Sequence, residues 1–97
     1  MASRFSSGLV VMTPGAIAAL RQAAGDAYFR LAADLVVRHA EGDWGEVDAE
    51  DAAANEYAVQ HGLRLLSVYR LPEGAGRLWL ITEADRSTTT LLLPDEY

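Results

Sequence analysis

The chain has 97 residues, of which 51% are hydrophobic and 23% charged, with no cysteine and a formal net charge of −6. This composition is that of a globular protein, and the length fits one domain spanning residues 1–97. The lack of cysteine excludes disulfides, thiolate metal sites and a cysteine nucleophile. All eight basic residues are arginines, outnumbered by fourteen acids. Direct nucleic-acid binding is therefore disfavoured, and a protein partner with a basic surface is favoured.

No targeting or cofactor motif is visible in the sequence. Residues 1–7 lack the apolar core of a signal peptide, and no apolar run approaches the roughly 18 residues that a membrane span requires. The chain also lacks a Gly-rich phosphate loop, a His-Glu-x-x-His motif and a Gly-x-Ser-x-Gly motif. We therefore expect a cytoplasmic protein with no membrane segment, no cofactor and no metal.

The first quarter of the chain predicts a strand followed by a helix. Residues 9–12 are apolar and include two valines, which favours a buried strand. Thr13 and Pro14 are typical of a helix start, because threonine caps free N–H groups and proline is tolerated at the first helical position. A helix is therefore expected over residues 14–23, and Gly25 ends it.

A second helix is expected over residues 27–40, with Asp26 as its cap. Its inner face has the three- and four-residue spacing of an amphipathic helix and consists of Tyr28, Leu31, Ala32, Leu35 and His39. His39 lies at the end of this helix. We interpret it as a packing or capping residue in preference to a catalytic one, with both roles left open.

A third helix is expected over residues 48–61, with Asp48 in a capping box and Gly62 in the left-handed position that ends it. The pattern is weakly amphipathic and allows two inner stripes. One stripe is Ala54, Tyr57, Ala58 and His61. The other is Ala52, Asn55, Glu56 and Val59. We prefer the first stripe because it keeps Glu56 in water.

From Leu63 onward the apolar pattern takes the two-residue period of strands. Three strands are expected, over residues 63–71, 78–82 and 88–93. A hairpin containing proline and glycine, residues 72–76, joins the first two, and a polar loop, residues 83–87, joins the last two. The threonines at 88–90 are β-branched, so we interpret them as strand residues and not as nucleophiles.

This order of elements predicts an α+β fold of the type β-α-α-α-β-β-β. The helices are expected to pack on an antiparallel sheet of three strands, with residues 9–12 available as a fourth. The expected core residues are Val10, Ile17, Leu20, Leu31, Leu35, Leu65, Tyr69, Leu78, Leu80, Leu91 and Leu93. Because a short antiparallel sheet leaves unpaired edges, we also consider a homodimer formed through a sheet edge.

Half of the acidic residues lie between positions 41 and 56, where no arginine interrupts them. They are Glu41, Asp43, Glu46, Asp48, Glu50, Asp51 and Glu56. This stretch is either an ordinary solvated surface, a docking face for a basic partner or a cation site, although its spacing does not match a calcium loop. Trp44 within it is either a cover for the edge of the core or an exposed interface anchor.

The polar loop 83–87 is the other stretch that departs from ordinary core material. Its charged side chains either shape a tight strand connection through hydrogen bonds and an ion pair, or act together with residues 42–51. The candidate partner-binding residues from the two stretches are Asp43, Trp44, Glu46, Asp48, Glu50, Asp51, Glu83, Asp85 and Arg86.

Several strings in the chain form one recognisable set. They are TPGA at 13–16, GDWG at 42–45, RLLSVY at 64–69, WLITEADRS at 79–87 and LLPDEY at 92–97. This set resembles a family of small bacterial proteins carried on plasmids and other mobile elements, known as plasmid-related proteins. The resemblance implies a mobile-element origin and brings no activity, cofactor or catalytic residue with it.

Charge and resemblance together favour a small acidic binding protein of a plasmid- or phage-type element. We expect it to inhibit a host defence nucleoprotein, in the manner of an anti-CRISPR or anti-restriction protein, by occupying a basic surface. The alternative is a small ribonuclease-like toxin, or another toxin–antitoxin component, that uses His61, Glu83 and Arg86. The acidic charge argues against the toxin, because such proteins hold RNA on basic surfaces.

Overall fold

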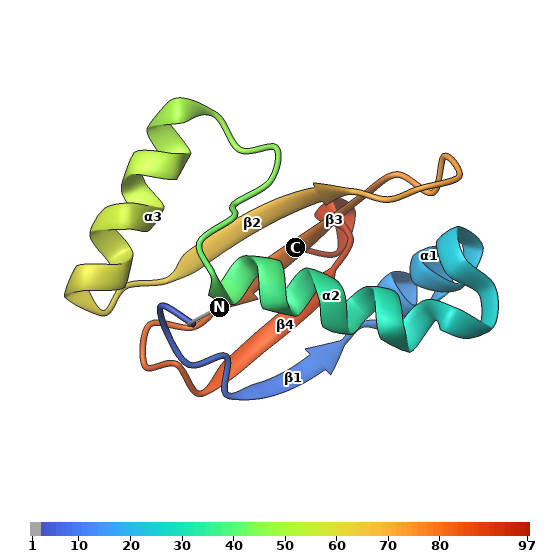
Figure 1. The fold of residues 1–97 in the computed structure, drawn as a ribbon, viewed down its shortest axis with the longest axis horizontal. Helices are drawn as coiled ribbons and strands as arrows, with labels where there is room; N and C mark the ends of the chain where they lie inside the picture. The colour runs from blue at the N-terminus through green and yellow to red at the C-terminus, as the bar shows by residue number, and fades with distance from the viewer. Residues whose placement is uncertain (1–2) are drawn as a thin grey trace.

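The computed structural model describes residues 3–97 and contains a four-stranded sheet and three α-helices (Figure 1). The elements are β1 (Leu9–Met12), α1 (Pro14–Ala24), α2 (Tyr28–Ala40), α3 (Ala49–His61), β2 (Leu65–Arg70), β3 (Arg77–Thr82) and β4 (Thr88–Leu92). Two short 3-10 turns occupy Gly25–Ala27 and Pro94–Glu96. Helix α2 lies across one face of the sheet, whereas α3 lies beside β2 (Figure 1).

The sheet has the strand order β1-β4-β3-β2 and is mixed. Strands β2, β3 and β4 form the predicted antiparallel meander. Strand β1 runs parallel to β4, with Leu9 opposite Thr88 and Met12 opposite Leu91. The α+β class is thus confirmed, whereas the prediction of a wholly antiparallel sheet is wrong. No short hairpin ties β1 to its neighbour in the sheet, so turn geometry does not impose an antiparallel direction on it.

Helix ends follow local chemistry at two of the three helices. The Thr13 hydroxyl accepts a hydrogen bond from the Ala16 N–H at 3.0 Å, which caps α1 as predicted. Asp48 caps α3, and Gly62, with φ of 65°, ends it. The predicted cap at Asp26 is wrong, because this residue lies in the 3-10 turn that links α1 directly to α2.

Two hydrophobic clusters form the interior. The main core lies between α1, α2 and the sheet and consists of Ala16, Ala19, Leu20, Ala32, Leu35, Tyr69, Leu71, Leu78, Leu80 and Leu91. The smaller cluster consists of Trp44, Ala58 and Leu65, with Phe5, Val47, Ala52 and Val59 packed against it. Most predicted core residues are buried, while Ile17, Leu31 and Leu93 are half-buried. The prediction that Val10 is a core residue is wrong, because β1 is an edge strand and Val10 is 41% exposed.

The face that α3 turns inward also differs from the preferred prediction. Asn55 and Ala58 are buried, whereas Tyr57 is 57% exposed. The inner stripe is therefore close to the alternative one. Glu56 on that stripe does not enter the core, because its carboxylate stays at the surface and binds the Arg4 guanidinium and the Trp44 indole.

Candidate functional site

A series of hydrogen-bonded, buried polar side chains crosses the sheet beneath the end of α2. The imidazole of His39, fully buried, lies 2.5 Å from the Ser67 hydroxyl through Nδ1 and 2.8 Å from the Thr82 hydroxyl through Nε2. Thr82 in turn lies 2.7 Å from the Thr89 hydroxyl, and Thr89 donates to the Ser7 carbonyl at 2.7 Å. These contacts satisfy His39 internally, which confirms the packing interpretation.

The Ser7 carbonyl, at the end of this series of hydrogen bonds, determines which group donates and which accepts in each of them. A carbonyl only accepts, so the Thr89 hydroxyl donates to Ser7 and must accept from Thr82. The Thr82 hydroxyl then accepts from His39 Nε2–H, and His39 Nδ1 accepts from Ser67. Only the Nε2–H tautomer of a neutral imidazole satisfies all four hydrogen bonds.

Burial keeps this imidazole neutral. Desolvation, together with the positive charge of Arg86, lowers the pKa of His39 from 6.5 to about 4. The rings of Phe5 and Trp44 pack edge-on against the imidazole, at 5.1 and 5.9 Å between centroids. A group sealed in this way has no access to substrate, so His39 is a structural residue.

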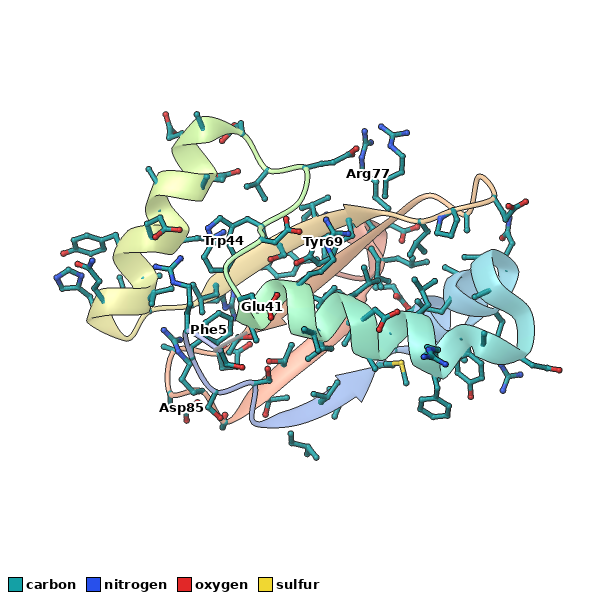
Figure 2. The ribbon with its side chains drawn as sticks, in the orientation of Figure 1. Phe5, Glu41, Trp44, Tyr69, Arg77 and Asp85 are labelled. Carbon is teal, nitrogen blue, oxygen red and sulfur yellow. The ribbon has the colours of Figure 1, made fainter. Side chains whose placement is uncertain are left out.

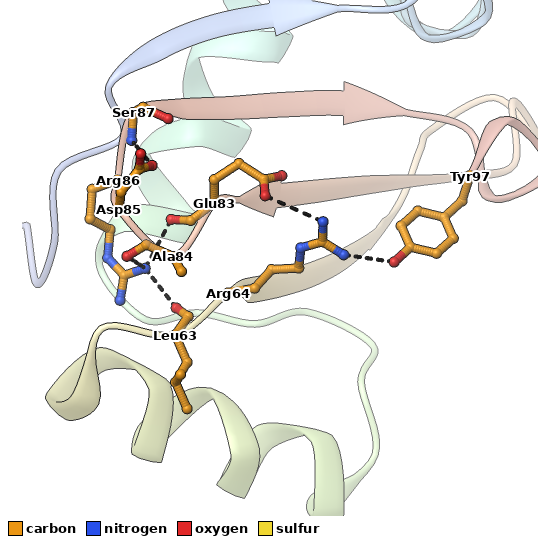
Figure 3. A network of polar contacts seen from close by, with 8 residues as sticks. All are labelled: Leu63, Arg64, Glu83, Ala84, Asp85, Arg86, Ser87 and Tyr97. Atoms are coloured by element: carbon orange, nitrogen blue, oxygen red, sulfur yellow. Dashed lines mark hydrogen bonds and ion pairs between the residues drawn. The ribbon is translucent and has the colours of Figure 1, made fainter.

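Arg86 links the loop 83–87 to the C-terminal end of α3 (Figure 3). Its guanidinium donates to the carbonyls of Ala58 at 2.9 Å and Leu63 at 2.6 Å, and to those of Glu83 and Ala84 in its own loop. A cation at this position also interacts favourably with the negative end of the helix dipole. Arg86 is therefore engaged with backbone carbonyls.

The other charged residues of this loop are also tied internally (Figure 3). Asp85 accepts from the Ser87 N–H at 3.0 Å, which forms the turn between the strands. Glu83 forms an ion pair with Arg64 at 3.3 Å, and Arg64 also donates to the Tyr97 hydroxyl. Of the two interpretations of the loop, these contacts support the strand connection. The ion pair, however, joins Glu83 to Arg64, the residue before β2, and not to Arg86.

The loop between α2 and α3 closes the free edge of β2. Gly45 forms a parallel bridge with Val68, whose carbonyl accepts from the Glu46 N–H and whose N–H donates to the Trp44 carbonyl. Gly45 has φ of 73°, and a Cβ there would overlap the Val68 carbonyl, so only glycine fits this position. Backbone geometry thus explains the second glycine of the GDWG string.

Trp44 covers the smaller hydrophobic cluster and is only 7% exposed. Figure 2 shows its side chain between α3 and β2, where it stacks on Phe5 with 6.2 Å between ring centroids. Its indole N–H donates to Glu56 at 3.0 Å. The interpretation of Trp44 as a cover for the core edge is confirmed, and its ring is not available as an exposed anchor.

Arginines neutralise two further carboxylates among the candidate partner-binding residues. Asp43 pairs with Arg38 at 2.7 Å, and this pairing lowers the pKa of Asp43. Glu46 pairs with both Arg70 and Arg77, which lower its pKa through hydrogen bonds. Asp43 thus ties loop 42–46 to α2, and Glu46 ties it to β2 and β3. Much of the acidic stretch is therefore already paired within the protein.

Three candidate carboxylates lie together at the N-terminal end of α3. Asp48 accepts a hydrogen bond from the Asp51 N–H at 2.7 Å, while Glu50 and Asp51 lie in the first helical turn. All three residues are exposed, and within residues 3–97 none of them forms an ion pair with an arginine. This group, which we call the α3 acidic end, is the part of the predicted site with carboxylates open to a partner.

The three residues of the alternative ribonuclease hypothesis each have separate contacts. His61 is exposed at the end of α3, where its Nδ1 lies 2.9 Å from the Tyr57 carbonyl and its ring stacks on Tyr57. Glu83 and Arg86 are engaged as described above. In the described part of the chain, no hydrogen bond joins the side chains of these three residues.

Two hollows in the surface are lined by none of the candidate partner-binding residues. One, of about 660 Å³, lies beside the β2–β3 hairpin and is lined by Arg70, Leu71, Glu73, Gly74, Gly76, Arg77 and Pro94. Its two arginines already share Glu46. The other, of about 430 Å³, is an apolar groove between β1 and α2. Residues 3–97 contain no group of three or more acidic or histidine side chains arranged to hold a metal ion.

Comparisons with protein-family models, curated proteins and solved structures gave no match. The resemblance to plasmid-related proteins therefore stays a prediction. Among residues 3–97, no helix has the length and apolarity needed to cross a membrane.

Proposed function

We propose that the protein is a binding protein and that the α3 acidic end is its contact with a basic partner surface. The observation that carries the proposal is the difference between this end and the rest of the acidic stretch. Asp43, Glu46 and Glu56 are neutralised by arginines of the same chain, whereas Asp48, Glu50 and Asp51 are exposed without an arginine partner in the described residues. Carboxylates in that state retain their charge for a partner.

The helix holds these carboxylates in a definite arrangement. Asp48 is fixed by its capping hydrogen bond, and Asn55 and Ala58 further along the helix are buried against the sheet side. A charged surface on an anchored helix loses less conformational entropy on binding than the same charges on a free loop. The α3 acidic end is therefore suited to a specific contact.

We further propose that the partner is a host defence nucleoprotein with a basic nucleic-acid channel, such as an RNA-guided or restriction complex. The net charge of −6 and the resemblance to plasmid-related proteins support this class of partner. The acidic end would occupy the channel and exclude the nucleic-acid backbone, since both compete for the same Lys and Arg side chains.

The experiment uses purified RNA-guided and restriction complexes and measures their DNA binding with and without this protein. The test variant carries Asp48→Asn, Glu50→Gln and Asp51→Asn, in which asparagine at position 48 keeps the helix cap. The control variant carries Asp26→Asn, Asp34→Asn and Asp95→Asn, which removes the same charge from exposed positions elsewhere.

We expect the wild type to inhibit DNA binding by at least one complex and the control variant to do so equally well. The test variant should inhibit about tenfold less, corresponding to roughly 1.4 kcal/mol from three exposed charges. Inhibition by the wild type should also weaken as salt is raised. Equal inhibition by the two variants would refute the contact surface, and no inhibition of any complex would refute the partner class.

A further inference from the structure

The two edges of the sheet differ in whether their backbone groups are satisfied. At the β2 edge, the Asn55 side chain donates to the Leu66 carbonyl at 2.7 Å and accepts from the Leu66 N–H at 3.1 Å. Loop 42–46 similarly satisfies both backbone groups of Val68. These contacts close the β2 edge to further strand pairing.

The β1 edge is open in the described residues. The N–H groups of Leu9 and Thr13 donate inward to the Ser87 and Leu91 carbonyls of the β4 side, at 2.9 and 3.0 Å. In a parallel ladder the bonded residues alternate, so the N–H and C=O groups of Val10 and Met12 point away from β4. An open edge of this kind is a template for another strand.

An apolar groove accompanies this open edge. It has a volume of about 430 Å³ and is lined by Val10, Met12, Phe29, Ala32, Ala33, Val36 and Val37. Phe29 is 63% exposed and Val37 is 54% exposed, and Leu9 on the opposite face of β1 is 68% exposed. Large apolar side chains exposed together around one groove, as Phe29 and Val37 are, are typical of an interaction site. The groove and the edge together form one surface, which we call the β1 surface.

We propose that the β1 surface binds a second copy of the chain, with the two β1 strands antiparallel and the two-fold axis passing at Val11. In this register Val10 lies opposite Met12 of the copy, and Met12 lies opposite Val10. The outward N–H and C=O groups of both residues are then used, giving four hydrogen bonds between the strands. The sheet continues across the axis as an eight-stranded sheet.

The fit of a copy follows from symmetry. A two-fold axis perpendicular to the sheet keeps like faces on the same side, so the α2 helices meet above the paired strands and each groove faces the other. Ala33 lies between Phe29 and Val37 along α2, and its small side chain permits the helices to approach at the usual distance of about 8 to 10 Å. An isologous contact of this type is the commonest in soluble oligomers.

Charge also favours a copy over a charged partner. None of the residues lining the groove or forming β1 is charged, although the chain carries a net charge of −6. The α3 acidic end lies beside β2, across the sheet from β1 (Figure 1), so the acidic ends of two copies would be far apart. Dimerisation therefore does not require the α3 acidic end to bind a partner.

The decisive experiment places single cysteines in a chain that has none of its own. In the proposed register the two Val11 residues form a non-hydrogen-bonded pair with Cα atoms about 4.5 Å apart, within the range of a disulfide. Two Leu9 residues would be about 14 Å apart, which is too far, because each strand rises about 3.4 Å per residue. Under oxidising conditions Val11→Cys should cross-link to a covalent dimer, and Leu9→Cys should not.

Native mass measurements complete the test. Light scattering across a range of protein concentrations should give a dimer mass for the wild type and for Leu63→Asp, a control that adds a charge at an exposed leucine outside the β1 surface. Phe29→Asp should shift the protein to monomer. Val10→Pro should also shift the protein to monomer, because proline removes the outward N–H of residue 10 while the pairing of β1 with β4 stays intact. A monomer mass for the wild type at every concentration, or cross-linking of Leu9→Cys in preference to Val11→Cys, would overturn the proposal.

Discussion

The two ends of α3 show opposite uses of charged side chains. At the C-terminal end, the Arg86 guanidinium binds four backbone carbonyls, including those of Ala58 and Leu63. At the N-terminal end, Glu50 and Asp51 are exposed and have no arginine partner within residues 3–97. Both ends follow the helix dipole, with the cation at the C-terminus and the acids at the N-terminus. The difference lies in whether the chain itself supplies the counter-charge.

This difference separates structural charge from charge that is available for binding. In the sequence, loop 83–87 and the acidic stretch 41–56 are both candidate binding segments, because they concentrate charged side chains. A guanidinium that binds carbonyls at a helix end and in a neighbouring loop stabilises the fold. Its loss leaves the Leu63 and Ala84 carbonyls without a partner in the described residues, whereas those of Ala58 and Glu83 keep backbone N–H donors. An exposed carboxylate at the other end contributes little to folding and keeps its charge for a partner. Substitutions at the two ends should therefore affect different properties.

Replacing Arg86 should have the largest effect on stability. Arg86→Ala removes all four carbonyl contacts, whereas the positive φ of 63° is common to both residues and adds nothing to the difference. We expect the free energy of unfolding, measured by chemical denaturation, to fall by about 3 to 4 kcal/mol. Arg64→Ala is the matched control, because its ion pair with Glu83 is exposed and should contribute less than about 1 kcal/mol. Equal losses in the two variants would contradict the structural role of Arg86.

Acidification should destabilise the protein through His39, the buried histidine at the C-terminal end of α2. The pKa of His39 is about 4 in the folded state and 6.5 in its ordinary environment, so the unfolded chain takes up this proton first as pH falls. The stability that depends on neutral His39 is fully present above pH 6.5 and should fall by about 3 kcal/mol as the pH approaches 4.

The measurement compares unfolding free energies of the wild type and His39→Gln between pH 7 and pH 4. The difference between them should shrink with falling pH, because glutamine cannot take up a proton in either state. His61→Gln, at an exposed histidine, is the control and should follow the wild type. A constant difference between wild type and His39→Gln across this pH range would show that His39 is not held neutral by the fold.

The elements of the fold were largely predictable because their signals are local. The cap at Asp48 and the left-handed Gly62 follow from side-chain and backbone preferences that act over a few residues. The parallel direction of β1 is not a local property, because β1 pairs with β4, from which three helices and two strands separate it along the chain. Keeping Glu56 in water does not select the inner stripe of α3, because its carboxylate stays at the surface and pairs with Arg4 even though the stripe that packs is close to the one containing it.

The candidate site was predictable only as a set of residue types. Sequence spacing cannot show that Glu46 meets Arg70 and Arg77, since these partners lie 24 and 31 positions away. It also cannot show that Asn55 satisfies the backbone of Leu66 and thereby closes one sheet edge. The apolar run of β1 was visible, but its exposure depends on its place in the strand order. Tertiary pairing decides which polar and apolar groups remain open.

The smallest predicted effects lie at the α3 acidic end itself. Asp48→Ala removes the cap and should lower the free energy of unfolding by about 1 kcal/mol, whereas Asp48→Asn keeps a capping oxygen and should change it by only a few tenths. Glu50→Gln removes one charge near the helix N-terminus and should lower stability by no more than about 0.5 kcal/mol. Chemical denaturation of the three variants tests this order. If Glu50→Gln destabilised the protein as much as Asp48→Ala, Glu50 would have an internal partner, and the charge at this end would be structural, as it is at the other.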